Sequence, residues 1–504
     1  MRVILAILAL LECTLPAVHK MQLRKITPEM IKMLRNGTWA KYIEGMRKQR
    51  QHAPRMDGDD DYKHDIISYN DIEYLGEITF GTPEQTFRVL LETSTSYPWI
   101  PDKLCYQKPD RPSACQSSQC DIGLICDVFC TEKSCCNLRG NHTTEDPCRR
   151  KRRFDMDRSN TYIKTARKFT TWRKRFARGF DGNDTFRFGA EGEDRLVIPG
   201  AIIGQAVRID PCIAHAHFDG VIGLGFVFSS PLLQAIRKGL LDQPIFTVFL
   251  KRTRSDKTVD NGRQYLIAKK AAKETVIATK AAHYDEQGVR EKDGSERLIC
   301  LLVRSSQRQV EDVEKFYRTN DEHGHLIIDR KKAKGEDNGY GGMITYGGFD
   351  FENCEQPVTY EPVDSVMYWQ VRLLGVSAGE YFMVSDAWKA ELDTATSFIR
   401  GPAAIISAIA KELGAQYDLS NDLYFIECDA PAAVKFLIGT MQYTVGAKNL
   451  IIEVQENLCI LALSRSSSPE DPPQWIFGYP FIREYCHVFD MSARKVGFAK
   501  ARQD

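Results

Sequence analysis

Short runs of β-branched and aromatic residues recur along the chain, and most are bounded by Gly, Pro, Asp or Asn. Branched and aromatic side chains suit a pleated strand and the bounding residues favour turns, so each run predicts a β-strand. The runs fall into two groups, before and after a long charged stretch, at residues 74–80, 87–91, 196–203, 343–346 and 450–454. The pattern predicts a mostly β protein whose strands are divided between two regions.

Near the N-terminus, Arg2 precedes an apolar run from Val3 to Leu11, and small residues follow near Ala17. This order is typical of a secretory signal peptide, although a short buried helix is an alternative. We expect a signal peptide over residues 1–18. No later apolar stretch approaches the roughly 20 residues that a membrane span needs. The pattern therefore predicts a protein without a membrane span that is secreted or lies in the endolysosomal lumen.

Length and charge narrow the picture. The 504 residues exceed what one hydrophobic core usually organises, which predicts two or more folded units. The 68 basic and 67 acidic residues give a formal net charge of +1. This balance offers no overall electrostatic reason to bind nucleic acid or an anionic membrane surface, and we expect neither partner.

The chain has 15 cysteines, and eight of them lie between Cys105 and Cys148. Without Cys13, which the signal peptide would remove, an even number remains, and an even, clustered set in an exported chain indicates disulfides. Zinc ligation is the alternative, but the cluster contains no Cys-x-x-Cys pair. We therefore expect no metal site and no cofactor. Asn-x-Ser/Thr triplets offer three candidate glycosylation sites: Asn36, Asn141 and Asn183.

Two segments outside the predicted strands are rich in charge. Residues 19–65 are basic and compatible with helix, and such a segment either covers an acidic cleft or is a solvated amphipathic N-terminus. Residues 251–340 are dense in Lys, Arg, Glu and Asp, and we expect a charged insertion there, with disorder as one alternative. Long surface insertions are tolerated because they cost little conformational free energy.

A five-residue motif occurs twice. Glu92-Thr93-Ser94-Thr95-Ser96 returns as Asp393-Thr394-Ala395-Thr396-Ser397, which is an acid followed by Thr, a small residue, Thr and Ser. Each copy precedes an apolar-apolar-Gly element, Val221-Ile222-Gly223 in the first half and Ile476-Phe477-Gly478 in the second. This repetition indicates a duplicated architecture.

These motifs, taken with their neighbours, resemble the pepsin-like aspartic peptidase family. In the first half the resemblance is carried by residues 76–83, 92–94, 99–101 and 218–225. In the second half it is carried, in the family's order, by residues 341–348, 368–370, 393–395, 475–483 and 495–498. The resemblance implies a mostly β, bilobal fold with two pseudo-symmetric β lobes and a cleft between them, in a monomer.

The resemblance also implies a division of the chain into segments. Residues 19–65 correspond to the activation propeptide, and residues 66–250 to the N-terminal lobe with a Cys-rich insert at 105–153. Residues 341–504 correspond to the C-terminal lobe. Within that lobe, Cys428 and Cys459 stand where the family has a disulfide.

The family's chemistry uses two carboxylates, one from each lobe, that share a proton and hold a water between them. One carboxylate takes a proton from the water while the other protonates the scissile carbonyl. The resemblance assigns these roles to Asp393 and to the altered position Glu92. It assigns Trp172 to the flap over the cleft, and it assigns supporting roles to four threonines: Thr93, Thr95, Thr394 and Thr396.

The sequence departs from the family where the chemistry is most sensitive. Glu92 carries its carboxyl on one additional methylene, and a displacement of roughly 1 Å can reduce a rate about 10²-fold. Ser94 and Ala395 replace glycines, and Arg173, Lys174 and Arg175 occupy a turn where small residues are usual. We expect a cleft that binds a peptide or protein with impaired proteolysis. The alternative is an active acid endopeptidase whose Glu/Asp dyad activates water.

A third hypothesis concerns the basic run at residues 149–153, which follows the cysteine cluster. Together they form a candidate interaction site that binds a polyanion or is cut by a dibasic-specific protease, and the alternative is a solvated loop. His215, His217, Asp386 and Glu391 are interpreted as ordinary polar residues.

Overall fold

The computed structural model describes residues 17–52, 73–105, 147–252 and 339–503, with two short pairs at 319–320 and 326–327. Short gaps inside these ranges fall at residues 96, 172–175, 192, 194, 211–212, 214–215, 227–228, 366 and 467–473. Three of the predicted features therefore lie outside the described residues: Trp172, Asn141 and most of the cysteine cluster. The first 16 residues, which contain most of the predicted signal peptide, lie outside them as well.

The chain divides into two compact units. The first comprises Met1–Arg252 and Asn338–Asp504, and the second comprises Thr253–Asp337. In the second unit the structure describes the antiparallel pair β10 (Thr319–Asn320) and β11 (Leu326–Ile327). The second unit coincides closely with the charged stretch between the two predicted groups of strands.

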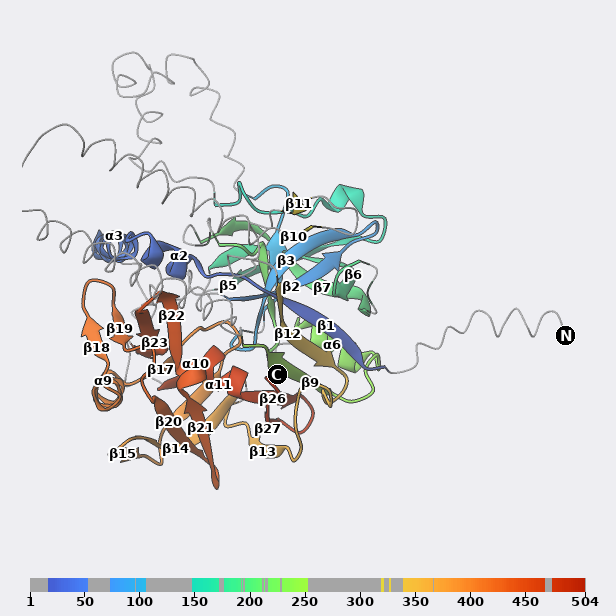
Figure 1. The fold of residues 1–504 in the computed structure, drawn as a ribbon. Coiled ribbons are helices and arrows are strands. Elements are labelled where there is room, and N and C mark those ends of the chain that lie inside the picture. Colours follow the sequence, from blue (N-terminus) through green and yellow to red (C-terminus); the bar gives the residue numbers. More distant parts are fainter. Residues whose placement is uncertain are drawn as a thin grey trace, which may run out of the picture. The chain divides into compact units, whose positions relative to one another are not determined.

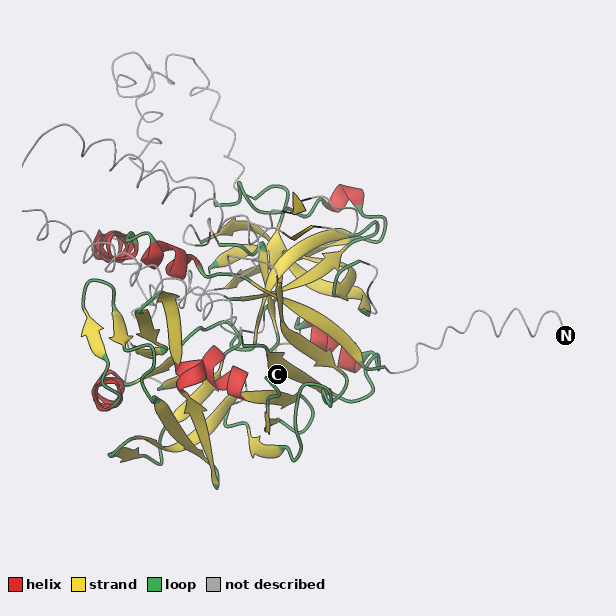
Figure 2. Cartoon of the chain, viewed as in Figure 1, coloured by secondary structure: helices red, strands yellow, loops and turns green. Residues whose placement is uncertain are grey.

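The described part of the first unit is mostly β, as Figure 2 shows by its yellow arrows. This confirms the fold class. The strands that precede the second unit are β1 (His19–Lys25), β2 (Tyr74–Phe80), β3 (Gln85–Glu92), β4 (Trp99–Pro101), β5 (Ile163–Thr171), β6 (Ala177–Phe188), β7 (Leu196–Ile209), β8 (Gly220–Gly223) and β9 (Ile245–Leu250). The helices of this half are α2 (Glu29–Arg35), α3 (Trp39–His52), the short 3-10 helix η5 (Met156–Arg158) and α6 (Pro231–Arg237).

The second half continues with strands whose ribbon is coloured from yellow to red in Figure 1. They are β12 (Gly339–Tyr346), β13 (Thr359–Pro362), β14 (Gln370–Ala378), β15 (Tyr381–Val384), β16 (Lys389–Leu392), β17 (Ile399–Gly401), β18 (Gln416–Asp418), β19 (Leu423–Ile426), β20 (Ala433–Ile438), β21 (Met441–Gly446), β22 (Ile451–Gln455), β23 (Leu458–Leu461), β24 (Leu463–Arg465), β25 (Trp475–Phe477), β26 (Tyr485–Asp490) and β27 (Lys495–Lys500). The helices are α9 (Ala403–Glu412), α10 (Ala447–Leu450) and α11 (Tyr479–Glu484).

Thirteen strands form one sheet in the order β13-β27-β26-β9-β12-β1-β2-β3-β8-β4-β7-β6-β5. Strands from both halves therefore share a continuous hydrogen-bonded ladder, with β1 between β12 and β2. The second half adds an eight-stranded and a four-stranded sheet. The runs predicted at 74–80 and 196–203 lie in β2 and β7, whereas the run at 450–454 begins on the last residue of α10 before it enters β22.

Both halves repeat one arrangement around the duplicated motif. In the first half β3 runs parallel to β8, and Glu92 lies opposite Gly223. In the second half β16 runs parallel to β25, and Leu392, the residue before Asp393, lies opposite Phe477. Each acid thus leaves a buried strand at the same point of an equivalent parallel pair, which agrees with the duplication predicted from sequence.

The N-terminal segment is folded onto the second half. Apolar side chains of α2 and α3 join one buried cluster with strands of the four-stranded sheet, and its fully or nearly fully buried members include Met30, Ile31, Trp39, Ile43, Leu423, Val454 and Ile460. The indole N–H of Trp39 donates to the carbonyl of Asn421 at 3.0 Å. The segment read as a basic N-terminus therefore contributes an apolar face to the core.

Three disulfides join described cysteines: Cys105–Cys148, Cys354–Cys486 and Cys428–Cys459. The pair Cys428–Cys459 is the one that the family resemblance implied. Within the described ranges, no helix is both long and apolar enough to cross a membrane.

Candidate active site

Glu92 ends strand β3 in the interior of the molecule, with only 1% of its surface exposed. The preceding residues Val89, Leu90 and Leu91 are buried, so the strand is held on both faces before it reaches the acid. The backbone carbonyl of Glu92 accepts a hydrogen bond from Leu224 N at 2.9 Å. This contact fixes the point where the chain turns into Thr93 and Ser94.

Asp393 follows β16 directly and is fully buried. Its backbone N–H donates to the carbonyl of Phe477 at 3.0 Å. Its carboxylate accepts two further bonds, from Ala395 N at 2.9 Å and from the hydroxyl of Thr396 at 2.5 Å. Two donors on one buried carboxylate hold its orientation.

Thr93 and Thr394 join the two acidic loops across 301 positions of sequence. Each backbone N–H donates to the hydroxyl of the other threonine at 3.1 Å. Each hydroxyl donates in turn to the residue before the opposite acid, from Thr93 to Leu392 O and from Thr394 to Leu91 O, both at 2.6 Å. We call these four bonds the threonine bridge. They bring the two motifs, predicted separately from sequence, into one site.

The hydroxyl that reaches the first acid belongs to Ser94. Its Oγ donates to Oε1 of Glu92 at 2.7 Å, and both residues are 1% exposed. In the second loop the side-chain donor is Thr396, which lies one position further along the motif than Ala395, the equivalent of Ser94. Thr95, by contrast, contributes a backbone carbonyl that accepts from Gly225 N at 3.2 Å. The sequence reading treated Ser94 only as a strained replacement of glycine and missed its hydroxyl as a ligand of Glu92.

Trp369 makes a further contact between the halves. Its indole N–H donates to the carbonyl of Leu224 at 3.0 Å, and the side chain is fully buried. Leu224 is the residue whose N–H holds the carbonyl of Glu92. The second half therefore helps to position the loop that lies beside the first acid.

The hairpin of β5 and β6 carries the region assigned to the flap, and its connection, with Trp172, lies outside the described residues. At the base of the hairpin, Asp181 accepts a short hydrogen bond from the hydroxyl of Tyr97 and forms an ion pair with Arg167 at 3.4 Å. Burial, together with the bond to Asp181, holds the pKa of Tyr97 well above its ordinary value. This contact links the hairpin to the loop that follows Glu92.

A cluster of charged side chains joins the N-terminal segment to both halves. Lys25 of β1 and Arg483 of α11 both pair with Glu73, at 2.7 and 3.0 Å. Burial by itself would raise the pKa of Glu73, but the two cations outweigh it and lower the pKa.

Helix α2 makes a second contact through Glu29, whose carboxylate lies 2.6 Å from Nε2 of His217 and 3.0 Å from Nζ of Lys32. Partial burial would raise the pKa of Glu29, and hydrogen bonds from Lys32 and His217 lower it overall. His217, interpreted from sequence as an ordinary polar residue, thus holds α2 against the first half.

The basic run at 149–153 is partly structural. Lys151 is buried, and its Nζ donates to the carbonyls of Ala216 at 2.5 Å and Phe218 at 2.8 Å. Burial lowers the pKa of Lys151 to about 8. The middle of this run therefore anchors the loop before Asp219. The run is not a wholly solvated loop, which was the alternative interpretation from sequence.

The remaining predicted positions are placed as follows. Asn36 is exposed at the end of α2, whereas Asn183 is partly buried within β6, where it pairs with β5 and β7. Among the described residues, no group of three or more His, Cys, Asp or Glu side chains has the arrangement of a metal site.

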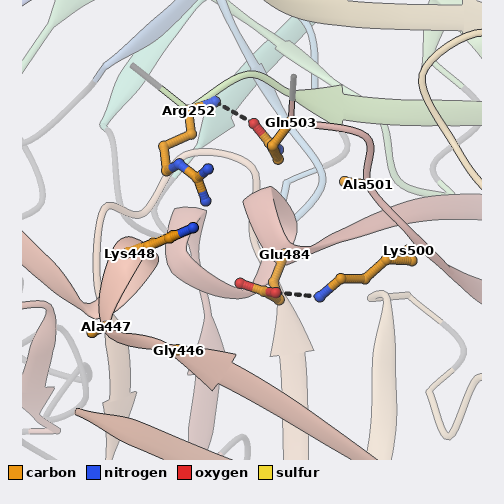
Figure 3. A pocket seen from close by; sticks show the side chains of 8 residues that line it. All are labelled: Arg252, Gly446, Ala447, Lys448, Glu484, Lys500, Ala501 and Gln503. Carbon is orange, nitrogen blue, oxygen red and sulfur yellow. Dashed lines mark hydrogen bonds and ion pairs between the residues drawn. The ribbon is translucent and has the colours of Figure 1, made fainter. Parts of the chain in front are cut away.

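A pocket of about 440 Å³ lies apart from both acidic motifs. Figure 3 shows its lining side chains, among them Arg252 and Lys448, with Glu484 paired to Lys500. None of the lining residues belongs to the motifs around Glu92 or Asp393, so this pocket is not the candidate active site.

Comparison with known proteins agrees with the geometry. The family model described as eukaryotic aspartyl protease matches residues 73–262 and 333–501. Aspartic protease 2 of Necator americanus is 37% identical over 517 residues, covering 100% of both chains. Aspartic protease 6 of Caenorhabditis elegans is 27% identical and covers 99% of this chain and 98% of its own. Human napsin-A is 25% identical, with 87% and 79% covered. The chain therefore belongs to the eukaryotic aspartyl protease family and is a pepsin-like member of it.

Proposed function

We propose that this protein binds peptides in the cleft between its lobes and hydrolyses them slowly, because Glu92 replaces the first catalytic aspartate. One observation carries the proposal. The threonine bridge ties the two acidic loops together symmetrically, while the first carboxyl is carried on a side chain that is one methylene longer than the second.

The chemistry gives the reason for the expected loss of rate. A shared proton and a single water require both carboxyl groups to meet at one point. The backbone at Thr93 is held by the bridge, so it cannot retreat to compensate for the additional methylene of Glu92. A displacement of roughly 1 Å at a reacting group can reduce the rate about 10²-fold.

Peptide binding depends on less exact geometry. The two loops are joined through the threonine bridge, and Trp369 adds a second buried contact between the halves. Two donors, Ala395 N and the hydroxyl of Thr396, hold the carboxylate of Asp393 in place. The framework that places a peptide between the lobes is thus retained, whatever the rate at which it is cut.

A second candidate function is that of an active acid endopeptidase with a Glu/Asp dyad. The bond from Ser94 favours it, because a hydroxyl in the place of glycine restricts the longer Glu92 to one orientation. Glu92 then serves as one partner of the proton-sharing pair and Asp393 as the other.

We assign residues 19–65 to a propeptide, residues 66–250 and 341–504 to the two lobes, and the mature monomer to a secreted or endolysosomal location. The contacts of Lys25, Glu29 and Trp39 with the rest of the chain support the first assignment. Among the relatives, one is named a probable vacuolar protease A, from Trichophyton verrucosum.

The test compares residues 19–504 with their Glu92→Asp, Ser94→Gly and Asp393→Asn variants, exposed to pH 3 to 5 and assayed on an unbiased peptide library. We expect slow or absent cleavage by the parent chain and a gain of about 10²-fold in Glu92→Asp. Binding of pepstatin, measured calorimetrically, reports the cleft independently of turnover.

Two results would decide for the second candidate. One is efficient cleavage by the parent chain that Asp393→Asn abolishes. The other is a lower rate in Glu92→Asp and in Ser94→Gly, which would show that the Glu92–Ser94 pair is the working arrangement. Absence of pepstatin binding in a folded protein would contradict both candidates.

A further inference from the structure

The pocket of about 440 Å³ in Figure 3 lies where β9, β21, α11 and β27 end and α10 begins. All of its lining residues belong to the first unit. The charged ones are the cations Arg252, Lys448 and Lys500 and the acid Glu484. The others are Gly446, Ala447, Ala501 and Gln503. The lining therefore carries an excess of positive charge.

The acid of the lining, Glu484, is already paired. Its Oε1 accepts a short hydrogen bond from the ammonium group of Lys500, and its Oε2 accepts one from the side-chain amide of Asn449 at 2.5 Å. Lys500 also lies over the ring of Tyr485, with Nζ 5.0 Å from the ring centroid. Both oxygens of Glu484 and the charge of Lys500 thus have partners in the wall of the pocket. The excess charge comes from Arg252 and Lys448.

The backbone of Arg252 is fixed to the wall of the pocket. Its N–H donates to Oε1 of Gln503 at 2.7 Å, and Nε2 of Gln503 donates to the carbonyls of Leu250 at 2.9 Å and Arg483 at 2.6 Å. These three bonds hold the amide of Gln503 and, through it, the main chain of Arg252. The side chain of Arg252 is partly buried, so it extends into the pocket from a point that the fold sets.

The two remaining cations face each other. Figure 3 shows the guanidinium group of Arg252 and the ammonium group of Lys448 pointing toward one another across the pocket. Neither group forms a hydrogen bond or an ion pair with any residue that the structure describes. Like charges repel, and an anion placed between them replaces one repulsion with two attractions. The geometry therefore favours a negatively charged occupant.

Charge and size together indicate the class of ligand. The fork of an arginine binds two oxygens of a phosphate at once, and a lysine supplies a point charge to a third. A phosphate monoester carries a charge of about −1.5 to −2 at pH 7, which matches two cations, whereas a single carboxylate compensates only one. Small-molecule sites have volumes of roughly 300–1,000 Å³, so this pocket also has room for a group attached to the phosphate.

We propose that this pocket binds a small phosphate monoester, with Arg252 and Lys448 as the residues that hold the phosphate. The attached group lies against Gly446, Ala447 and Ala501, whose small side chains offer little apolar surface, so that group is polar. The carboxylate of Glu484 weakens the binding, because its charge is paired but lies beside the site. None of the lining residues belongs to the two acidic motifs, so the proposal does not depend on the activity of the dyad.

The experiment measures the binding of glycerol 3-phosphate to residues 19–504 by isothermal titration calorimetry at pH 7.5 and low salt. The test variant is Arg252→Gln/Lys448→Gln. The matched control removes one exposed arginine and one exposed lysine elsewhere, Arg237→Gln/Lys411→Gln, so both variants lose the same net charge. We expect the test variant to bind at least about 10-fold more weakly, since a hydrogen bond to a charged group contributes about that factor. The control should bind like the parent.

A third variant changes the affinity in the opposite direction. Glu484→Gln keeps a carbonyl oxygen for the amide of Asn449, removes the negative charge beside the phosphate and releases the ammonium group of Lys500. We expect this variant to bind glycerol 3-phosphate roughly 2- to 5-fold more tightly than the parent. Weaker binding would contradict the placement of the phosphate beside Glu484 and overturn the proposal.

Succinate and inorganic phosphate serve as comparison ligands. Three results would overturn the proposal outright: no binding of glycerol 3-phosphate by the parent chain, equal weakening in the control variant, or tighter binding of succinate than of glycerol 3-phosphate. The last would identify the pocket as a dicarboxylate site. Inorganic phosphate that binds as tightly as the ester would show that the pocket recognises a bare anion, and the assignment to a monoester would then be wrong.

Melting curves separate the loss of a ligand from the loss of the fold. A ligand that binds only the folded state raises the melting temperature, so glycerol 3-phosphate at about 100 times its dissociation constant should raise that of the parent and the control but not that of the test variant. Without ligand, all three proteins should melt at about the same temperature. A clearly lower value for the test variant would show that Arg252 or Lys448 supports the fold, and the reason given for a binding role would then be wrong.

Discussion

The threonine bridge provides the sharpest test of how the two halves are joined. Thr93→Val removes one hydroxyl at almost constant volume and leaves two buried groups without their partner, the carbonyl of Leu392 and the N–H of Thr394. A buried polar group left unpaired costs about 1–3 kcal/mol. The two together predict a loss of roughly 2–6 kcal/mol in the free energy of unfolding, with no cavity contribution.

The same chemical change has the opposite sign elsewhere in the fold. Thr345 is fully buried, and its hydroxyl finds no hydrogen-bond partner among the described residues. Thr345→Val replaces an unpaired hydroxyl with a methyl group, so we expect a neutral or stabilising effect of about 1 kcal/mol. The two variants therefore form a matched pair.

Thermal unfolding of both variants, followed by tryptophan fluorescence and calorimetry with the disulfides intact, measures the difference. For lobes of this size, 1 kcal/mol corresponds to roughly 2–4 °C in melting temperature, so Thr93→Val should melt at least about 5 °C below Thr345→Val. Equal melting temperatures would refute the view that the bridge joins the loops energetically.

Three further predictions follow from buried groups. Burial lowers the pKa of Lys151 to about 8 from its ordinary 10.5, so between pH 8 and 10.5 the unfolded state binds more protons than the folded state. The free energy of unfolding should therefore rise as the pH increases from 8 to 10.5. In melting curves measured over this range, Lys151→Met should flatten the rise, and the control Lys238→Met should not. Burial also lowers the pKa of His487 to about 3, so the stability should fall as the pH drops from 6.5 towards 3, and His487→Phe should narrow the difference in melting temperature between pH 7 and pH 4. Trp39→Ala should cost about 3–5 kcal/mol in the docking of α3. Limited proteolysis measures this: residues 19–52 should be digested faster in Trp39→Ala than in the control Lys41→Ala. Equal rates of digestion would contradict a docked helix.

Local pattern was sufficient for the strands that pack on a buried face. The composition of residues 74–80 and 196–203 predicted β2 and the first part of β7, because branched and aromatic side chains with bounding turn residues act over a few positions. The duplicated acidic motif likewise located both loops of the candidate site. The run at 450–454 was less clear, since α10 ends at Leu450 and the strand begins only at Ile451.

Residue types in a charged run did not reveal which side chain would be buried. Lys151 lies among four arginines, and composition favours solvent for all five. Its carbonyl partners, on Ala216 and Phe218, are about 65 positions away in sequence, so only folding brings them to its ammonium group. The same holds for His217, whose partner Glu29 is 188 positions distant.

The sequence by itself determined the class of fold, the positions of the two acids and the altered identity of Glu92, because these depend on short patterns and on single residues. The tertiary structure decided how those acids are held. It placed the hydroxyl of Ser94 on Glu92, joined Thr93 to Thr394, and brought Arg252 and Lys448 to one pocket. Such contacts depend on strand register and on backbone groups from distant segments, and a hydrogen bond forms only when both partners arrive at about 3 Å with the right direction.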